Sequence, residues 1–361
     1  DGIRDHCVTG VQTCALPIYR FWRPKRGKLP VYPAIEPQSD SPEGQGGDSG
    51  PVGRLAPSPT GVLHLGNARS FLLAWLSIRR QGGKMLLRIE DLDGPRVKQG
   101  AIDSAIEDLQ WLGLDWDGEI RIQSRFRERH EAAISSLVDR GLAYPCVCTR
   151  REIEEAASAP HESELPSTET VYPGTCRNRW ASVEEARNSS GREPAIRLRL
   201  DSESVPFMDG FRGQEPGVLA GDFVLQKRDG TPAYQLAVVV DDVADGVTEV
   251  LRADDLIPST PRQLLLYRLF QWESPIMIHV PLLVGADGLR LAKRHGDTSL
   301  AHYRRQGVTA EEVVGALASL SGLTEEGQKL RPEDLIDAFD LGKVPAAPVI
   351  WNDSRLGVSR D

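Results

Sequence analysis

Short apolar runs alternate with longer segments of helical spacing along the chain after residue 51. In chain order we predict a strand at Val52–Ala56, a helix at 64–81, a strand at Lys84–Glu90, and helices at Val97–Leu112 and Arg127–Arg140. Gly82 and Gly83 end the first of these helices. Because strands and helices alternate, the sequence predicts an α/β protein with a parallel sheet.

The second half of the chain continues this pattern after a break between residues 146 and 206. We predict strands at Phe223–Lys227, Ala233–Val240, Val247–Arg252 and Ile276–Val284, and a helix at Pro261–Trp272. Asp229 and Gly230 predict a turn between the first two of these strands. Residues 309–340 have helical patterns, which indicates a small helical tail domain.

Length and composition narrow the class of protein. A chain of 361 residues is long enough for about two domains with a small insertion. Its 40% hydrophobic and 26% charged residues exclude a wholly disordered chain, and its net charge of −9 argues against a nonspecific nucleic-acid coat. Five sparse cysteines do not form a disulfide framework, and no apolar stretch approaches the length of a membrane span. We expect a cytoplasmic enzyme.

The first fifty residues differ from the rest of the chain. Gln38–Gly50 is rich in Gly, Ser and charged residues and predicts disorder. Residues 8–18 read VTGVQTCALPI, which resembles the translation of a common sequencing-library adaptor. We therefore interpret 1–50 as a disordered extension that arose as a sequencing artefact, with a genuine poorly ordered extension as the alternative. Cys7 and Cys14 are left out of the functional reasoning.

Residues 54–67 read RLAPSPTGVLHLGN and join a strand end, a proline-stiffened loop and a glycine-containing helix start. Gly61 and Gly66 allow the backbone to approach a ligand closely. The free N–H groups and the dipole at a helix N-terminus favour anions, and His64 would lie where it can donate to a phosphate. An H-x-G triplet taken alone is more often a surface histidine at a helix start.

The same segment resembles the H-I-G-H signature of class I aminoacyl-tRNA synthetases, and further motifs resemble the glutamyl group. These motifs lie in order at LRIEDLD (87–93), WLGLDWD (111–117), AYPCVC (143–148), AYQLAVVVDD (233–242), VLRADDL (250–256), STPRQ (259–263) and LRLAKR (289–294). The resemblance covers about residues 53–300. It implies a Rossmann-type parallel sheet that activates an amino acid with ATP.

The resemblance also implies an ATP site. His64, Gly66 and Asn67 would contact ATP at the helix start, and Lys293 matches the lysine of the K-M-S-K-S-type loop. Here the loop motif is degenerate, since it reads LAKRH and lacks the serine. His64 and Lys293 are the expected catalytic residues, because a mobile ammonium suits the charge that develops on the phosphates. The alternative is a solvated basic loop.

Glutamate is the amino acid that the resemblance implies. The family's glutamate-contacting positions fall on Arg54, Ala56, Ser58, Glu90, Tyr234 and Arg252. The chemistry agrees, because two arginines can fork onto carboxylates and one glutamate can take the ammonium. Arg252 would select a carboxylate over an amide, since a guanidinium accepts no hydrogen bond. Individually, each of these residues is more often part of a surface ion pair.

Three cysteines follow the first set of motifs at short spacing: Cys146, Cys148 and Cys176. In a reducing compartment such a set suggests one structural zinc ion, with three reduced cysteines as the alternative. The fourth ligand could be Tyr172, His161, an acid or water. We favour Tyr172 because the C-x-C…Y-x3-C pattern resembles that of the family's short members.

The length of the tail points to a particular branch of this family. Residues 295–361 are enough for a small helical tail but not for an anticodon-binding domain. This short architecture with zinc resembles the glutamyl-queuosine tRNA(Asp) synthetases. The resemblance implies glutamate activation by ATP with Mg²⁺ and without tRNA. Glutamate then passes to the cyclopentene diol of queuosine in the anticodon loop of tRNA(Asp).

Three alternatives stay open: a truncated glutamyl-tRNA synthetase, a noncatalytic zinc RNA-binding paralogue, and a small-molecule ATP-dependent ligase on the same fold. We expect a monomer that does not bind membranes. Five arginines could contact RNA phosphates or form an ordinary charged face: Arg177, Arg179, Arg192, Arg197 and Arg199. The expected division is 1–50 extension, 51–145 first half of the Rossmann catalytic domain, 146–206 zinc-binding insertion, 207–300 second half with the lysine loop, and 301–361 helical tail.

Overall fold

The computed structural model describes residues 50–92, 94–157, 171–201, 204–219, 221–291 and 297–358. The segment interpreted as adaptor-derived lies outside these residues. So do His161 and Lys293, two residues with predicted roles in metal and ATP binding.

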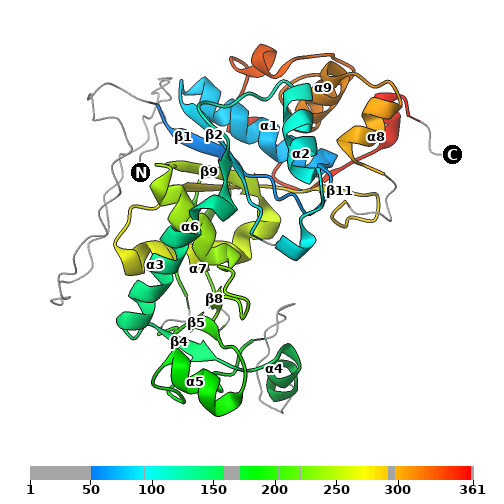
Figure 1. Ribbon diagram of the computed structural model, residues 1–361. Helices are drawn as coiled ribbons and strands as arrows, with labels where there is room; N and C mark the ends of the chain where they lie inside the picture. Colours follow the sequence, from blue (N-terminus) through cyan, green and yellow to red (C-terminus); the bar gives the residue numbers. More distant parts are fainter. Residues whose placement is uncertain are drawn as a thin grey trace, which may run out of the picture. The chain divides into compact units, whose positions relative to one another are not determined.

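A parallel sheet forms the centre of this fold, and three of its strands, β1 (Val52–Leu55), β2 (Lys84–Ile89) and β9 (Glu249–Ala253), are labelled in Figure 1. β1, β2 and β3 (Arg121–Ile122) pair in that order, and β9 pairs with β10 (Ile276–Val280). β1 and β9 lie side by side, joined at their starts because the Thr248 amide donates to the Val52 carbonyl (2.9 Å). The strand order is therefore β3-β2-β1-β9-β10, which confirms the predicted parallel α/β sheet.

Successive side chains of these strands enter two different cores, as the two-residue period of a strand requires. On β2, Met85 and Leu87 join the core that contains α1 (Leu65–Arg80) and α2 (Ala101–Trp111), whereas Leu86 joins the other core. That second core contains α3 (Arg127–Asp139), α6 (Tyr234–Ala244) and α7 (Thr260–Phe270). The parallel strands are thus buried on both faces.

The expected strand at Ala233–Val240 is wrong, because residues 234–244 form the helix α6. Its Ala-Val-Val-Val run has strand propensity, but all residues from Leu236 to Asp242 are buried, so this helix has little polar surface to reveal its period. The predicted turn is present. After β8 (Val224–Gln226) the chain turns back through a bridge between Gln226 and Pro232, and then enters α6.

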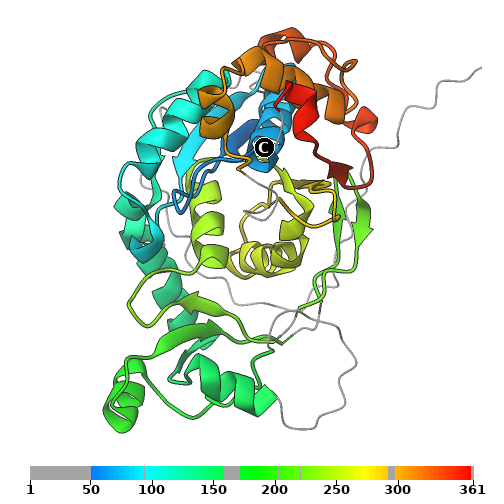
Figure 2. The same cartoon turned by 90° about the vertical axis from the view of Figure 1, so that its right-hand side faces the viewer.

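A separate antiparallel sheet carries the cysteines. β4 (Ala143–Cys146), β5 (Ala195–Leu198) and β8 pair in that order, and α5 (Val183–Ser190) packs on β4. Figures 1 and 2 show this sheet, with α4 (Arg150–Ala157), far from α9. Its outer strands come from both sides of the expected 146–206 insertion. The hairpin β6 (Phe207–Asp209) and β7 (Gly213–Glu215) lies against β10.

The C-terminal helices pack onto the parallel sheet's own core. α9 (Ala310–Leu320) contacts α1, and its Val313 and Leu317 belong to the core of α1. β12 (Val349–Ile350) pairs in parallel with β11 (Leu283–Val284), and α8 (Leu300–Arg305) completes this region. The shorter 3-10 helices are η1 (Gly94–Arg96), η2 (Gln123–Phe126), η3 (Asp254–Ser259), η5 (Pro332–Leu335), η6 (Leu341–Lys343) and η7 (Asp353–Leu356). Across the described ranges, every helix is too short or too polar to cross a bilayer.

Candidate active site

The loop after β1 leads to the N-terminus of α1, where His64 is the capping residue. Its Nδ1 accepts from the Gly66 amide (3.1 Å), while Asn67 Oδ1 accepts from the His64 amide (3.3 Å). Burial lowers the pKa of His64, and the charge of Arg290 acts in the same direction. The ring is therefore neutral with its proton on Nε2, the nitrogen from which it could donate to a ligand. The side-chain oxygen of Asn67 is therefore engaged in the helix cap.

The segment that carries Lys293 lies outside the described residues, but both of its flanks are fixed. After it, the Leu300 amide donates to the Leu63 carbonyl (3.0 Å), and the Leu65 amide donates to the Thr298 carbonyl (3.1 Å). Before it, Arg290 pairs with Asp255 (2.7 Å), which follows β9. The chain on the C-terminal side of Lys293 is therefore bonded directly to the His64 loop.

Four of the predicted glutamate-contacting residues lie where β1, β2, β9 and α6 meet. Arg54 is 7% exposed, and its Nε donates to Asp242 Oδ1 (3.3 Å). Arg252 is 6% exposed, and its Nη1 donates to the Tyr234 hydroxyl (3.4 Å). Glu90 directly follows β2. Parallel strands bind ligands at their carboxyl ends, and β1 and β9 are the two strands between which the strand order reverses.

The pKa shifts of Arg252 and Glu90 report which charged groups lie near them. Burial lowers the pKa of Arg252; the positive charge of Arg54 adds to this, whereas Tyr234 and Glu90 oppose it. Burial also raises the pKa of Glu90, against the opposing charges of Arg88 and Arg54. Arg54, Glu90 and Tyr234 therefore all lie within electrostatic range of Arg252.

Ala56 and Ser58 lie in the loop between β1 and α1. Ala56 is half-buried and Ser58 is exposed. The Glu90 amide donates to the Pro57 carbonyl between them (3.0 Å), so this loop is held against the end of β2. All six expected glutamate residues therefore lie on or just after the strands and helix that border one site.

The sequence analysis named Glu90 but missed its partner Arg88 and the two other acids around that arginine. This fully buried guanidinium pairs with Glu90 (3.1 Å), Asp242 (2.7 Å) and Asp245 (3.3 Å), and we call this group the Arg88 cluster. Burial opposes the charge of Arg88, but these carboxylates raise its pKa well above the ordinary value. The sequence did contain a signal for this cluster. Asp242 follows the apolar run of α6, and a buried acid in such a segment must be paired.

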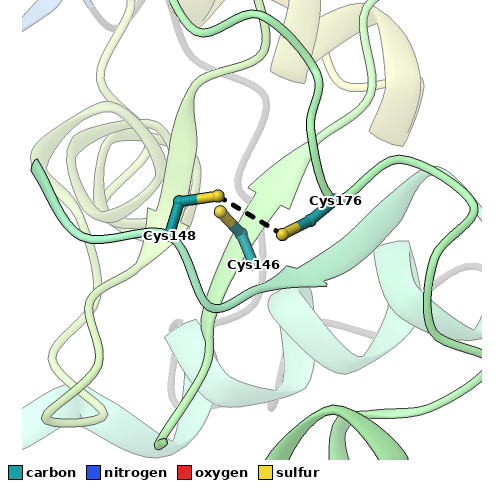
Figure 3. A group of neighbouring side chains, drawn as sticks. All are labelled: Cys146, Cys148 and Cys176. Atoms are coloured by element: carbon teal, nitrogen blue, oxygen red, sulfur yellow. Dashed lines mark hydrogen bonds between the residues drawn. The ribbon is translucent and has the colours of Figure 1, made fainter. Parts of the chain in front are cut away.

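The three cysteines lie together in the antiparallel sheet region (Figure 3). Their sulfur atoms are all within 4.8 Å of one another, and the Cys148 and Cys176 sulfurs are 3.5 Å apart. The Tyr172 hydroxyl oxygen lies 3.3 Å from Cys146 Sγ and 3.6 Å from Cys148 Sγ, and it accepts from the Cys176 amide (2.8 Å). Three sulfurs and one oxygen therefore converge, as in a four-ligand site.

The chemistry of this donor set fits a metal ion. Burial raises the pKa of the Cys148 thiol to about 12, so the thiolate that binds metals needs a nearby cation. Arg197 brings a positive charge to the other side of the cluster: its Nε donates to Cys146 Sγ (3.3 Å), and its guanidinium lies 3.9 Å from the centre of the Tyr172 ring. The cluster could hold one metal ion.

The five arginines of this region are engaged with the fold around them. Arg177 pairs with buried Asp222, Arg192 pairs with Glu152 (2.9 Å), and Arg197 contacts the cysteine cluster. The remaining two lie over aromatic rings, Arg179 over Trp180 and Arg199 over Tyr144. These contacts agree with an ordinary charged face at least as well as with a surface that binds RNA phosphates.

The fold and this site define a class I aminoacyl-tRNA synthetase catalytic domain. Residues 52–357 match the family described as tRNA synthetases class I (E and Q), catalytic domain. The chain belongs to that family and, within it, to the glutamyl-Q tRNA(Asp) synthetases. It is 48% identical over 307 residues to the glutamyl-Q tRNA(Asp) synthetase of Symbiobacterium thermophilum, covering 82% of this chain and 94% of the relative. The Nocardia farcinica protein of the same name is 46% identical, with 85% and 95% covered.

Longer synthetases match over part of their length. The glutamate–tRNA ligase of Azorhizobium caulinodans is 40% identical over 308 residues, which cover 84% of this chain but 64% of the ligase. A glutamate tRNA ligase from Elizabethkingia meningosepticum, solved in complex with its amino acid, superimposes with a TM-score of 0.72 at 27% identity. It covers 85% of this chain and 68% of its own.

Proposed function

We propose that this protein activates glutamate with ATP and transfers it to queuosine in the anticodon loop of tRNA(Asp). The observation that carries the proposal is the convergence of Arg54, Glu90 and Arg252 at the carboxyl ends of the parallel strands, beside the His64 helix start. A glutamate zwitterion has two carboxylates and one ammonium, which match two buried arginines and one buried carboxylate.

In the proposed binding mode, Arg252 takes the side-chain carboxylate of glutamate. Arg54 faces the other carboxylate, and Glu90 accepts from the ammonium. Tyr234 adds a hydroxyl and a wall, and the loop of Ala56 and Ser58 closes the site next to the α-carbon. An amide in place of the side-chain carboxylate would direct N–H groups at a guanidinium that can only donate.

ATP would lie along the N-terminus of α1. The backbone at Gly66 lets phosphates approach, His64 Nε2 donates to them, and Asn67 keeps that histidine in place through the helix cap. Lys293 would neutralise charge on the phosphates together with the Mg²⁺ that accompanies ATP. Both flanking segments of Lys293 are anchored near this loop, which suits that role.

The reaction then has two steps. An oxygen of the glutamate α-carboxylate attacks the α-phosphorus of ATP, and pyrophosphate leaves. A hydroxyl of the queuosine diol then attacks the acyl carbon of glutamyl-adenylate, and AMP leaves while the hydroxyl proton passes to solvent or phosphate. The scheme uses no protein nucleophile, so the rate comes from positioning and electrostatic stabilisation.

The first test is glutamate-dependent ATP–pyrophosphate exchange without tRNA, on the full chain, with Lys293→Ala as the control. Exchange that disappears in the control supports the proposal. Exchange that requires tRNA(Glu) would instead indicate a truncated glutamyl-tRNA synthetase. Absence of exchange under both conditions would indicate a noncatalytic RNA-binding paralogue.

The second test concerns the acceptor. Radiolabelled glutamate should be transferred to tRNA(Asp) that contains queuosine and not to the same tRNA(Asp) carrying guanosine at that position. Transfer to tRNA(Glu) at a comparable rate would contradict the proposed acceptor. The label should leave tRNA(Asp) with the queuosine-containing fragment after nuclease digestion, which distinguishes modification from aminoacylation of the 3′ end.

We further propose that Cys146, Cys148, Tyr172 and Cys176 hold one structural zinc ion and that the chain acts as a monomer. The matched variants are Tyr172→Phe and Tyr144→Phe, because Tyr144 lies in the same cluster of buried side chains but bonds to Asp222 instead of the thiols. Tyr172→Phe should lower the zinc content of the purified protein, whereas Tyr144→Phe should retain one zinc ion per chain. Equal zinc content in both variants would exclude Tyr172 as a ligand, and light scattering tests the monomer.

A further inference from the structure

The guanidinium of Arg252 is surrounded by side chains that accept hydrogen bonds but carry no charge. Its Nε donates to His279 Nε2 (2.9 Å), and its Nη2 donates to Thr260 Oγ1 (2.9 Å) and to Gln263 Oε1 (2.8 Å). We call His279, Thr260 and Gln263 the acceptor cage. The cage is buried, with its members at most 2% exposed, so water does not replace these bonds.

His279 can accept at Nε2 only when its proton lies on Nδ1. That nitrogen lies 2.5 Å from Asp209 Oδ2, so it donates to this carboxylate. Asp209 Oδ1 accepts from the amides of Phe211 (3.0 Å) and Arg212 (2.9 Å) in the β6–β7 turn. The backbone therefore fixes Asp209, and Asp209 fixes the tautomer and the orientation of His279.

A second chain of hydrogen bonds fixes the other side of the cage. Gln263 Nε2 donates to Gln235 Oε1 (3.1 Å), and Gln235 Nε2 donates to Ser259 Oγ (2.9 Å). Because the amide nitrogen of Gln263 is used in this way, its oxygen is left to face Arg252. Both sides of the cage thus offer lone pairs to the guanidinium.

We infer that Asp209 and His279 are positioning residues that hold Arg252 in register for the side-chain carboxylate of the substrate. The inference rests on the proposed function, since it assigns Arg252 to that carboxylate. Asp209 lies on β6 and His279 on β10, two strands that contact each other, and neither residue touches glutamate in the proposed binding mode.

The neutral imidazole of His279 between Asp209 and Arg252 is the essential part of this arrangement. A carboxylate in direct contact with Arg252 would complete an ion pair, and a ligand carboxylate would then gain less from binding there. Through the imidazole, Asp209 controls where the guanidinium points without occupying its donors. Substrate recognition therefore depends on the lone pair at His279 Nε2.

The test uses two substitutions at the same buried position. His279→Leu removes the acceptor, whereas the amide oxygen of Gln in His279→Gln can take the place of Nε2. In the exchange assay, His279→Leu should raise the KM for glutamate about 10- to 100-fold, the effect of a lost bond to a charged group, with little change in the KM for ATP. His279→Gln should recover most of this loss. Asp209→Asn should give an intermediate KM for glutamate, because it frees the ring tautomer.

A matched control is His130→Leu. His130 is also fully buried and bonded to an aspartate, with Nε2 2.6 Å from Asp241 Oδ1, but it lies on α3 away from the acceptor cage. This variant should change thermal stability while leaving the ratio of the two KM values within about threefold of the unsubstituted protein. A merely structural role of His279 would make the two leucine variants behave alike.

The outcomes separate this inference from the proposed function. An unchanged KM for glutamate in His279→Leu, or equal changes in the KM values for glutamate and ATP, would overturn the inference while exchange by the unsubstituted protein upholds the function. If the unsubstituted protein shows no exchange, the function fails, and calorimetric titration with glutamate decides the inference. Binding that weakens in His279→Leu supports it, and absence of glutamate binding by the unsubstituted protein overturns both.

Discussion

Two buried arginines on neighbouring parts of one sheet have opposite surroundings. Arg88 on β2 contacts three carboxylates in the Arg88 cluster, whereas Arg252 on β9 makes four hydrogen bonds that all end on uncharged side chains. Accordingly, the pKa of Arg88 is raised by its acidic partners in spite of burial, and that of Arg252 is lowered by burial.

This difference distinguishes Arg88, whose charge has a structural role, from Arg252, whose charge is available to bind a ligand. Arg88 is already neutralised, so its bonds join β2 to α6. Among the described residues, Arg252 forms no ion pair, and the more distant charges of Asp242 and Glu90 do not offset its burial, so a ligand carboxylate can relieve the remaining desolvation cost. A buried guanidinium in a neutral cage is therefore a better guide to a carboxylate site than an arginine in an ion pair.

The largest effect on stability is expected from the Arg88 cluster. Arg88→Met leaves the carboxylates of Glu90, Asp242 and Asp245 facing an apolar side chain, which should lower the free energy of unfolding by about 3–5 kcal/mol. Urea denaturation measures this change. The matched control is Arg187→Met, because the pair of Arg187 with Glu193 is half-exposed and water screens it, so its loss should change the free energy of unfolding far less. Similar losses in the two variants would contradict the structural role of Arg88.

The reverse pattern is expected at Arg252. Arg252→Gln keeps an N–H donor for the acceptor cage but removes the charge, so stability should change by less than about 2 kcal/mol. Glutamate binding should weaken by about 2–5 kcal/mol, or roughly 30- to 4000-fold, because the substrate carboxylate loses its buried partner. Calorimetric titration with glutamate measures the loss. A stability loss as large as that of Arg88→Met would remove the distinction between the two arginines.

The sequence motifs predicted Arg54 and Arg252 as ligand-binding arginines, but they did not predict the contrast between Arg252 and Arg88. Arg54, Glu90, Tyr234 and Arg252 were identified through motifs, and the alternation of strands and helices predicted the parallel sheet. The partners of Arg252 come from Asp209, Thr260, Gln263 and His279, whose separation in sequence hides their contact. A buried ion pair also cannot be told from a neutral cage by composition alone.

The helix α6 also shows that tertiary contacts cannot be read from the local sequence. Its β-branched run predicted a strand, since local propensity was the available signal, and burial on most sides overrides that propensity. Cysteine spacing, in contrast, predicted a cluster that the structure contains, because C-x-C and a nearby cysteine leave few ways to arrange three thiols. The proposed zinc ion is tested by the zinc measurement.

The neutral state of His279 gives a prediction that depends on pH. Burial lowers the pKa of His279, and Arg252 adds to this, although Asp209 and Asp254 act in the opposite direction. A histidine with a folded-state pKa below its unfolded value of about 6.5 stabilises the protein fully above that pH, and this stability is lost as the pH falls. The loss is at most about 1.4 kcal/mol per pH unit.

His279→Gln isolates this contribution, because glutamine does not titrate. The difference in free energy of unfolding between the unsubstituted protein and His279→Gln should shrink as the pH falls from 8 to 5. Urea denaturation across this range measures the difference. A difference independent of pH would mean that His279 keeps the same protonation state in the folded and unfolded protein, and the acceptor cage would not depend on its neutrality.

The smallest effect is expected at Tyr234, the outermost partner of Arg252. Its hydroxyl lies 3.4 Å from Arg252 Nη1, a long hydrogen bond, and the residue is 39% exposed, so water can replace the bond. Tyr234→Phe should therefore weaken glutamate binding by about 0.5–1.5 kcal/mol, or roughly 2- to 12-fold in KM, without changing the KM for ATP. Exchange kinetics at varied glutamate concentration measure the effect. A loss as large as that of Arg252→Gln would show that the hydroxyl, rather than the uncompensated charge, dominates recognition, and the contrast between the two buried arginines would then lose its functional meaning.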